Sequence, residues 1–258
     1  MLDSRALGWL RDADLLEVAG ENFRSRVRFS SIGEHLYAHS AYPTTDANAI
    51  FFGPDTYRFA NLVAAEMQAR SLVPGARILD VCCGGGPGGI EAAICSKPAE
   101  TGFADINETA LDFARANAGL AGLEGAAFFQ GDLFNPTDGL FDLVIANPPY
   151  LVDPAHRVYR NGGGERGAGL SERIVLEGLT KLAPGGRLIL YTGVAIIEGV
   201  DPFHKKISQF LQEKGAHFSY REIDPDVFGE ELETPGYADA ERIAAVGLVV
   251  HSNSRNSP

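Results

Sequence analysis

The chain has 258 residues, of which 45% are hydrophobic, and a formal net charge of −12 at pH 7. This apolar content is enough for one large domain, or for one domain with a small extension. Proteins that bind nucleic acids usually carry a basic face, and Lys205-Lys206 is the only adjacent basic pair in the sequence. We therefore expect no nucleic-acid partner.

The sequence gives no sign of export or of a metal site. No apolar run approaches the roughly 18 residues that a membrane helix needs, and residues 1–14 carry five charged side chains, unlike a signal peptide. We expect a cytoplasmic protein with no membrane partner. The three cysteines (Cys82, Cys83 and Cys95) and the six histidines show no ligand spacing, so we expect free thiols and no metal.

The first 50 residues differ in pattern from the rest. They read as a helix followed by loop, and we interpret them as a short helical N-terminal extension or lid whose core is too small to stand alone. Residues 51–251 are expected to form the main domain. Residues 252–258 are polar and are expected to be a disordered tail.

From residue 77 onward, short apolar runs alternate with helical patterns, which is typical of a βαβ sheet. The expected strands are residues 77–81, 100–104, 126–130, 141–146, 187–192, 217–223 and 243–251. The expected helices are residues 88–95, 108–118, 170–182 and 202–214. The last two strands have no helix between them and should pair antiparallel. The sequence thus predicts an α/β, Rossmann-like, seven-stranded and mostly parallel sheet with a C-terminal antiparallel hairpin.

A glycine-rich turn follows the first expected strand. Gly84, Gly86 and Gly89 satisfy the pattern G-x-G-x-x-G between a strand and a helix. Glycines there permit positive φ and let a ligand contact the backbone. The turn indicates a nucleotide-type cofactor, but it does not separate NAD from S-adenosylmethionine (SAM).

Two acidic residues stand at the ends of the next strands. Asp105 ends the second strand, where a carboxylate can accept hydrogen bonds from both ribose hydroxyls. Asp132 follows the third strand and could reach the adenine edge. Either could be an ordinary cap or turn residue, but their order at strand ends favours cofactor binding.

The fourth strand ends in Asn147-Pro148-Pro149-Tyr150. Two prolines fix an extended backbone without N–H donors, so that the carbonyls there act as acceptors. The Asn147 carboxamide adds an acceptor, and Tyr150 adds a flat face for stacking. This combination suits a planar –NH2 group, and we interpret Asn147, Pro148 and Tyr150 as catalytic.

These motifs resemble the class I SAM-dependent methyltransferases that carry N-P-P-Y, a group that includes the release-factor glutamine N5-methyltransferases (HemK/PrmC type) and several adenine and guanine N-methyltransferases. The resemblance covers residues 53–192. It rests on ILDVCCGGGPGGI, ADINETALDFARANA, GDLFNPTDGLFDLVIANPPY, the segment at 53–56 and the segment NGGGERGAGLSERI. It implies SAM as the cofactor and implies, as cofactor-binding residues, Asp80, Cys82, Gly84, Gly86, Asp105, Ile106, Asp132, Leu133 and Asn147.

The sequence also departs from the glutamine methyltransferases. Gly53 and Tyr57 replace the arginine and the glutamate of their P-R-P-D-T-E segment, and residues 224–241 form an extra acidic insertion. These departures put a release-factor substrate in doubt. We expect methyl transfer to an amide or amine nitrogen of a small molecule or a protein side chain.

Several questions stay open at this stage. The loop 151–169, with its mobile glycines, and the segment 37–56 are expected to close over the site, and Tyr159, Arg160, Tyr191 and His39 are candidate substrate contacts. One alternative is an enzyme that consumes SAM without methyl transfer, by cyclising its aminobutyrate arm to azetidine-2-carboxylate and releasing methylthioadenosine. A further alternative is an NAD-dependent oxidoreductase, which would not explain Asn147-Pro148-Pro149-Tyr150.

Overall fold

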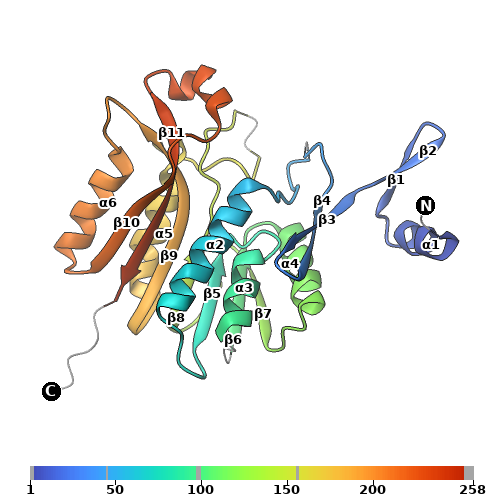
Figure 1. Cartoon of the computed structure of the whole chain (residues 1–258), viewed down its shortest axis with the longest axis horizontal. Coiled ribbons are helices and arrows are strands. Elements are labelled where there is room, and N and C mark those ends of the chain that lie inside the picture. Colours follow the sequence, from blue (N-terminus) through green and yellow to red (C-terminus); the bar gives the residue numbers. More distant parts are fainter. Residues whose placement is uncertain (1–2, 45, 97–99, 155–156, 253–258) are drawn as a thin grey trace.

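A computed structural model of the chain describes residues 3–44, 46–96, 100–154 and 157–252 (Figure 1). The expected tail lies outside this part of the chain apart from Ser252. That residue is not part of a tail, because its backbone N–H donates to the Gly186 carbonyl at 2.9 Å. No helix among the described residues is both long and apolar enough to cross a membrane.

A seven-stranded sheet forms the centre of the molecule, as predicted. Its strands lie in the order β10-β11-β9-β8-β5-β6-β7. In chain order they are β5 (Arg77–Val81), β6 (Glu100–Asp105), β7 (Ala126–Gln130), β8 (Phe141–Ala146), β9 (Leu182–Ile196), β10 (His217–Asp224) and β11 (Arg242–His251). Strands β5 to β9 pair parallel, whereas β11 pairs antiparallel with both β9 and β10. The C-terminal hairpin is therefore confirmed.

Helices cover both faces of this sheet (Figure 1). One face carries α2 (Pro54–Ala69), α3 (Pro87–Ser96) and α4 (Glu108–Leu120), and the other carries α5 (Gly169–Gly178) and α6 (Pro202–Glu213). Side chains alternate along β5, so that Ile78 packs toward α2 while Leu79 and Val81 pack toward α5 and α6. Because both faces are covered, the central strands are apolar almost throughout, as parallel strands usually are.

Helix α2 was not predicted from the sequence. Its start is a clear signal in retrospect, because Pro54 occupies the first turn, where a missing N–H costs nothing. Its buried side chains include Phe59, Leu62 and Val63. Their packing beside the cavity places the segment 53–56 at the carboxyl end of the sheet, above β9.

The N-terminal extension has more strand than the sequence indicated. Helix α1 (Ser4–Asp12) agrees with the expected helix, but the part expected as loop forms two antiparallel hairpins. They are β1 (Leu16–Ala19) with β2 (Asn22–Ser25), and β3 (Val27–Ile32) with β4 (His35–Ser40). The turns Gly20-Glu21 and Gly33-Glu34 supply the positive φ that tight hairpins need. The division of the chain into extension and main domain stays a prediction.

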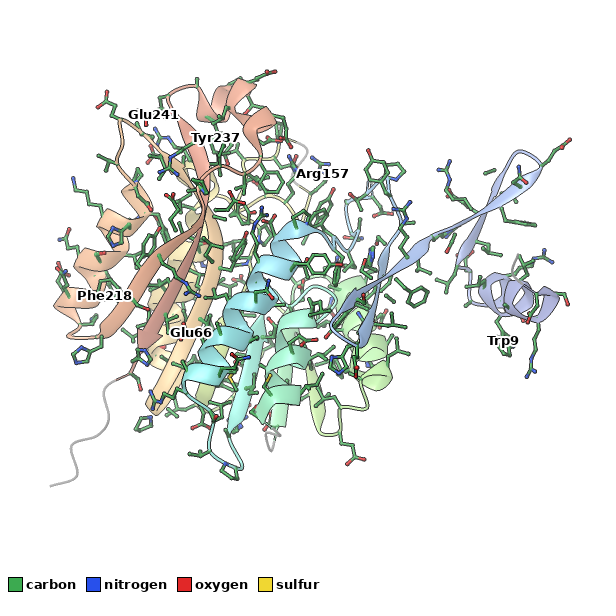
Figure 2. All side chains as sticks on the ribbon, viewed as in Figure 1. Trp9, Glu66, Arg157, Phe218, Tyr237 and Glu241 are labelled. Carbon is green, nitrogen blue, oxygen red and sulfur yellow. The ribbon has the colours of Figure 1, made fainter. Side chains whose placement is uncertain are left out.

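The two hairpins differ in their attachment to the main domain. The second is fixed by Asn117 of α4, which exchanges hydrogen bonds with the Ala38 backbone at 2.7 and 3.0 Å. By contrast, none of residues 3–26 is buried. Figure 1 shows this distal part standing away from the sheet, and Figure 2 shows Trp9 on it.

Candidate active site

A cavity of about 360 Å³ opens at the carboxyl ends of the parallel strands. This volume falls in the range of roughly 300–1,000 Å³ that is usual for ligand sites. The predicted site residues that line it are Cys82, Gly84, Asp105, Ile106, Asp132, Leu133, Asn147, Pro148, Tyr150, Tyr159 and Arg160. Most of the predicted site residues thus lie around one cavity.

Gly84 presents bare backbone to this cavity. Its φ is +53°, and a side chain there would meet no protein atom within 4 Å. Gly86 also has positive φ, at +79°, but it does not line the cavity, because it packs against Phe103 and Ala114. Gly86 thus helps to close the turn, and direct contact between this residue and the cofactor stays a prediction.

Asp80 is also placed differently from the expectation. It is buried beneath the glycine turn, where its Oδ2 accepts a hydrogen bond from the Gly89 N–H at 2.8 Å, and it does not line the cavity. Burial raises the pKa of this carboxyl to about 8. Asp80 thus holds the start of α3 in place and has no direct contact with the cavity.

Asp105 has the bonding capacity that a ribose requires. Its Oδ2 accepts from the Gly84 N–H at 2.9 Å, and its Oδ1 accepts from the Asn107 N–H at 2.9 Å. A carboxylate offers about four acceptor positions, so two remain for a diol. Burial raises the pKa of Asp105, and the backbone N–H groups around it oppose that shift. The site fits the ribose of a nucleoside cofactor.

The remaining predicted cofactor residues surround the same end of the cavity. Ile106 is 60% exposed and Leu133 is buried, and both line it with aliphatic groups. Asp132 lines it too, but both its oxygens already pair with Arg173, at 3.1 and 2.9 Å. Cys82 contributes a thiol whose pKa is raised by burial and which is therefore neutral.

Asn147 is the polar group that the fold leaves available. Its side chain lines the cavity, half-buried, and makes no hydrogen bond to any other described residue. Pro148 and Pro149 follow it along the cavity wall. Because it borders the cavity and has no partner among the described residues, this carboxamide is available to a ligand.

The Tyr150 ring packs tightly against β9. Gly193 lies directly against its ring, since a Cβ there would be 2.3 Å from the ring carbons. The ring also makes edge contacts with Tyr191 and Phe228, at centroid distances of 6.4 and 6.0 Å. The buried hydroxyl has no hydrogen bond among the described residues. Burial, and secondarily the nearby Asp55 carboxylate, raises the pKa of this hydroxyl.

The loop after this motif packs backbone against backbone. A Cβ on Gly162 would lie 1.9 Å from the Gly167 carbonyl oxygen, and one on Gly167 would lie 2.2 Å from the Tyr150 carbonyl oxygen. The Gly162 N–H donates to the Leu151 carbonyl at 2.9 Å. Gly162 and Gly167 thus have a packing role, whereas a Cβ on Gly163 would meet no atom within 4 Å, and movement of the loop stays a prediction.

Two of the four candidate substrate contacts line the cavity. Tyr159 donates its hydroxyl to the Thr44 carbonyl at 2.6 Å, and Arg160 pairs with Glu231. Tyr191 is fully buried, does not line the cavity and donates to Asp55 at 2.7 Å. His39 is buried against Phe52 and the Ser40 carbonyl. Tyr191 and His39 do not line the cavity, and substrate contact by any of the four residues stays a prediction.

Other cavity residues were missed. Phe51, Asp55, Arg157 and Phe228 all line it. Asp55 stands in the quoted segment 53–56, so its position was a usable signal. Phe228 is the single phenylalanine of the acidic insertion 224–241, and no local pattern marks it as a site residue.

The insertion is folded onto the loop that follows Tyr150. Tyr237 is buried, and its hydroxyl accepts from the Val152 N–H at 3.1 Å. Glu231 and Asp239 pair with Arg160 and Arg166 of that loop. Figure 2 shows Arg157 and Tyr237 on this side of the molecule, above the carboxyl ends of the parallel strands. The insertion is thus part of the wall of the site.

No group of three or more His, Cys, Asp and Glu side chains among the described residues could hold a metal ion. The polar groups that line the cavity include Asp105, beside Gly84, and Asn147.

Comparison with known proteins shows that the chain is similar to methyltransferases. The family model "Methyltransferase small domain" matches residues 58–196, more than half of the chain. The release factor glutamine methyltransferase of Deinococcus radiodurans is 35% identical over 162 residues, which cover 57% of this chain and 55% of that protein. The ribosomal RNA small subunit methyltransferase C of Chromohalobacter salexigens is 31% identical over 116 residues, 45% of this chain and 31% of that protein.

The fold is similar to that of solved structures. The structure of TYW2 from M. jannaschii in complex with AdoMet has a TM-score of 0.57 at 14% identity and covers 92% of this chain and 91% of that one. The chain spans little more than half the length of the first curated relative and about a third of the second.

One expectation is overturned by these relatives. Because an RNA methyltransferase is among them, the expectation that no nucleic acid is a partner is wrong. Net charge was a poor guide, since it sums over the whole chain and says nothing of one surface.

The cofactor question is settled in favour of SAM, and the NAD alternative is set aside. The resemblance found in the motifs is confirmed over the Rossmann-like part of the chain. The chain belongs to the methyltransferase small domain family, and its cofactor is S-adenosylmethionine.

Proposed function

We propose that this protein transfers the methyl group of SAM to the nitrogen of a planar –NH2 group. The observation that carries the proposal is the Asn147 carboxamide, which lines the cavity without a hydrogen-bond partner among the described residues. The two relatives are a release factor glutamine methyltransferase and a ribosomal RNA methyltransferase, and both glutamine and RNA contain such groups.

The cofactor would lie across the glycine turn. Its ribose hydroxyls would donate to the free acceptor positions of Asp105. The part of the cofactor that crosses the glycine turn would lie against the open backbone of Gly84. Ile106 and Leu133 would pack against the adenine, with Asp132 at its edge. When bound, SAM supplies a methyl group activated by its sulfonium.

Asn147 and Pro148 would orient the acceptor. The two N–H groups of a planar amine would donate to the Asn147 side-chain oxygen and to the Pro148 carbonyl, which turns the nitrogen lone pair out of conjugation and toward the methyl group. Orientation of this kind supplies on the order of 7–11 kcal/mol where the geometry is good. Tyr150, fixed by Gly193 and its neighbouring rings, would support the flat acceptor.

The proton leaves the nitrogen after the methyl group has been transferred. The product nitrogen is then cationic and acidic, so no strong base is required at the Asn147 end. Asp55, which lies beside Tyr150 and lines the cavity, adds a negative charge to this end of the site.

The variant Asn147→Ala tests this assignment. Calorimetry should show SAM and S-adenosylhomocysteine affinities within about twofold of wild type, while kcat should fall about 100-fold or more, because the acceptor loses its orientation. Asn61→Ala, at an exposed position of α2, is the matched control and should change neither quantity. Wild-type kcat in Asn147→Ala would refute the catalytic role.

A further inference from the structure

Two nearly parallel aromatic rings line the cavity. Phe51 and Tyr159 both line it, with an angle of 11° between their planes and centroids 6.5 Å apart. Tyr159 is fixed from both sides, by its hydroxyl bond to the Thr44 carbonyl and by the Arg157 guanidinium 5.7 Å from its ring. These rings come from segments about 100 residues apart in the chain, so the fold assembles them at this site.

The position of the Phe51 ring depends on Gly53. A Cβ at Gly53 would lie 2.4 Å from the Phe51 Cζ, so any other residue there would displace the ring. Gly53 is the residue that departs from the arginine of the resembled segment. This departure therefore has a structural consequence, because it makes room for an aromatic side chain at the cavity.

A third ring comes from the acidic insertion. Phe228 has left-handed backbone angles, φ 54° and ψ 43°, which are uncommon for a bulky residue and cost on the order of 1–2 kcal/mol. Its ring meets the Tyr150 ring edge-on, at 66° and 6.0 Å, and the Arg160 guanidinium lies 5.9 Å from its centroid. Such strain at a cavity wall is typical of functional positions.

The rest of the insertion keeps Phe228 there. The Glu231 N–H donates to the Phe228 carbonyl at 2.9 Å, and the Glu231 carboxylate pairs with Arg160. Arg166 pairs with Asp239 at 2.6 Å, and the Val152 N–H donates to the Tyr237 hydroxyl. These acids are therefore used to attach the insertion to the loop after Tyr150.

We infer that Phe51, Tyr159 and Phe228 determine acceptor specificity and select a heteroaromatic amine, that is, an –NH2 group on a flat ring. This rests on the proposed nitrogen methylation and narrows its substrate class. Glycine and aliphatic groups such as Ile106 and Leu133 line the cavity near Asp105, whereas Phe51, Tyr159 and Phe228 add three aromatic side chains to its lining. A nucleobase-like ring gains about 1–3 kcal/mol from each aromatic face on which it stacks, whereas a side-chain carboxamide offers much less flat area.

Methyl-labelled SAM offered with three kinds of probe tests the inference. The probes are free nucleoside monophosphates, total ribosomal RNA and a glutamine-containing peptide. We expect label on the nucleotides or the RNA, and the distribution between those two identifies the source of the ring. Phe228→Leu and Phe51→Leu should each raise the KM for the labelled probe about 5- to 100-fold, with S-adenosylhomocysteine affinity within about twofold of wild type.

The controls separate packing from recognition. Phe23→Leu changes an exposed phenylalanine of β2 that does not line the cavity, and it should leave KM unchanged. Leucine keeps most of the apolar volume, and melting temperatures of all variants check that they are folded.

The inference is overturned if KM is unchanged in both cavity variants, if only the peptide is labelled, or if neither nucleotide nor RNA is labelled. Asn147→Ala in the same assay separates this failure from a failure of the proposed function. Peptide labelling that is lost in Asn147→Ala would retain nitrogen methylation and reject the aromatic selection. Labelling that persists in Asn147→Ala would reject the proposed function itself.

Discussion

At the scale of single residues, the site is defined by polar atoms with bonding capacity left over. Asn147 has no partner among the described residues, and Asp105 keeps acceptor positions after binding two backbone N–H groups. Asp80, Gly86 and Tyr191 show the opposite arrangement, because they are enclosed by the protein and act through their neighbours. Identical residue types therefore differ in role according to what surrounds them.

Asp105→Ala should weaken binding of S-adenosylhomocysteine about tenfold or more. The substitution strands the ribose hydroxyls and also the Gly84 and Asn107 N–H groups, and an unsatisfied polar group costs about 1–3 kcal/mol. Isothermal calorimetry measures the change. Asp112→Ala, which removes an acid of the following helix α4 that pairs with Arg115 at the surface, is the control and should bind normally. Unchanged affinity in Asp105→Ala would mean that another carboxylate holds the ribose.

At the scale of elements, the central feature is the close contact between the Asn147–Leu151 segment and the glycine loop behind it. Gly167 has φ +81° and its Cα faces the Tyr150 carbonyl, whereas Gly163 has φ +65° but open space around it. Two glycines of one loop, both left-handed, thus differ only in whether a side chain has room.

Gly167→Ala should consequently be far more damaging than Gly163→Ala. Both substitutions pay a left-handed backbone cost of roughly 1 kcal/mol, but only Gly167→Ala forces backbone apart next to Tyr150. We expect Gly167→Ala to lower the melting temperature by several degrees more than Gly163→Ala does and to reduce turnover strongly. Scanning calorimetry and an activity assay compare the pair. Equal behaviour of the two variants would contradict the packing role of this loop.

Most of the helices and strands could be predicted from the sequence. All seven sheet strands and the helices α3 to α6 were predicted, because alternating apolar runs and helical periodicity are local signals. The hairpins β1–β2 and β3–β4 were missed, although their glycine turns are local signals, and the attachment of the second hairpin to Asn117, about 80 residues away, has no local signal. Phe51 and Phe228 were missed for a similar reason: nothing local indicates that their rings meet one cavity.

At the scale of the whole molecule, the overall charge of −12 proved misleading. Several acids that contribute to this charge are paired, such as Asp239 with Arg166 and Glu231 with Arg160. These pairs attach the insertion 224–241 to the loop after Tyr150. The charge that a partner meets is set by what remains unpaired on one face. Substrate class is accordingly better inferred from the lining of the cavity than from a sum over the chain.

The central claim is that SAM serves as a methyl donor here, and analysis of its products by mass spectrometry tests this most directly. The protein is incubated with SAM, with and without ribosomal RNA, nucleotides and a glutamine-containing peptide. The account predicts S-adenosylhomocysteine in the presence of an acceptor, in equal amount to the methylated product, and loss of both in Asn147→Ala. Methylthioadenosine released from SAM alone, without S-adenosylhomocysteine, would contradict the account, because it would show that the bond from sulfur to the aminobutyrate arm is broken in place of the bond from sulfur to the methyl group.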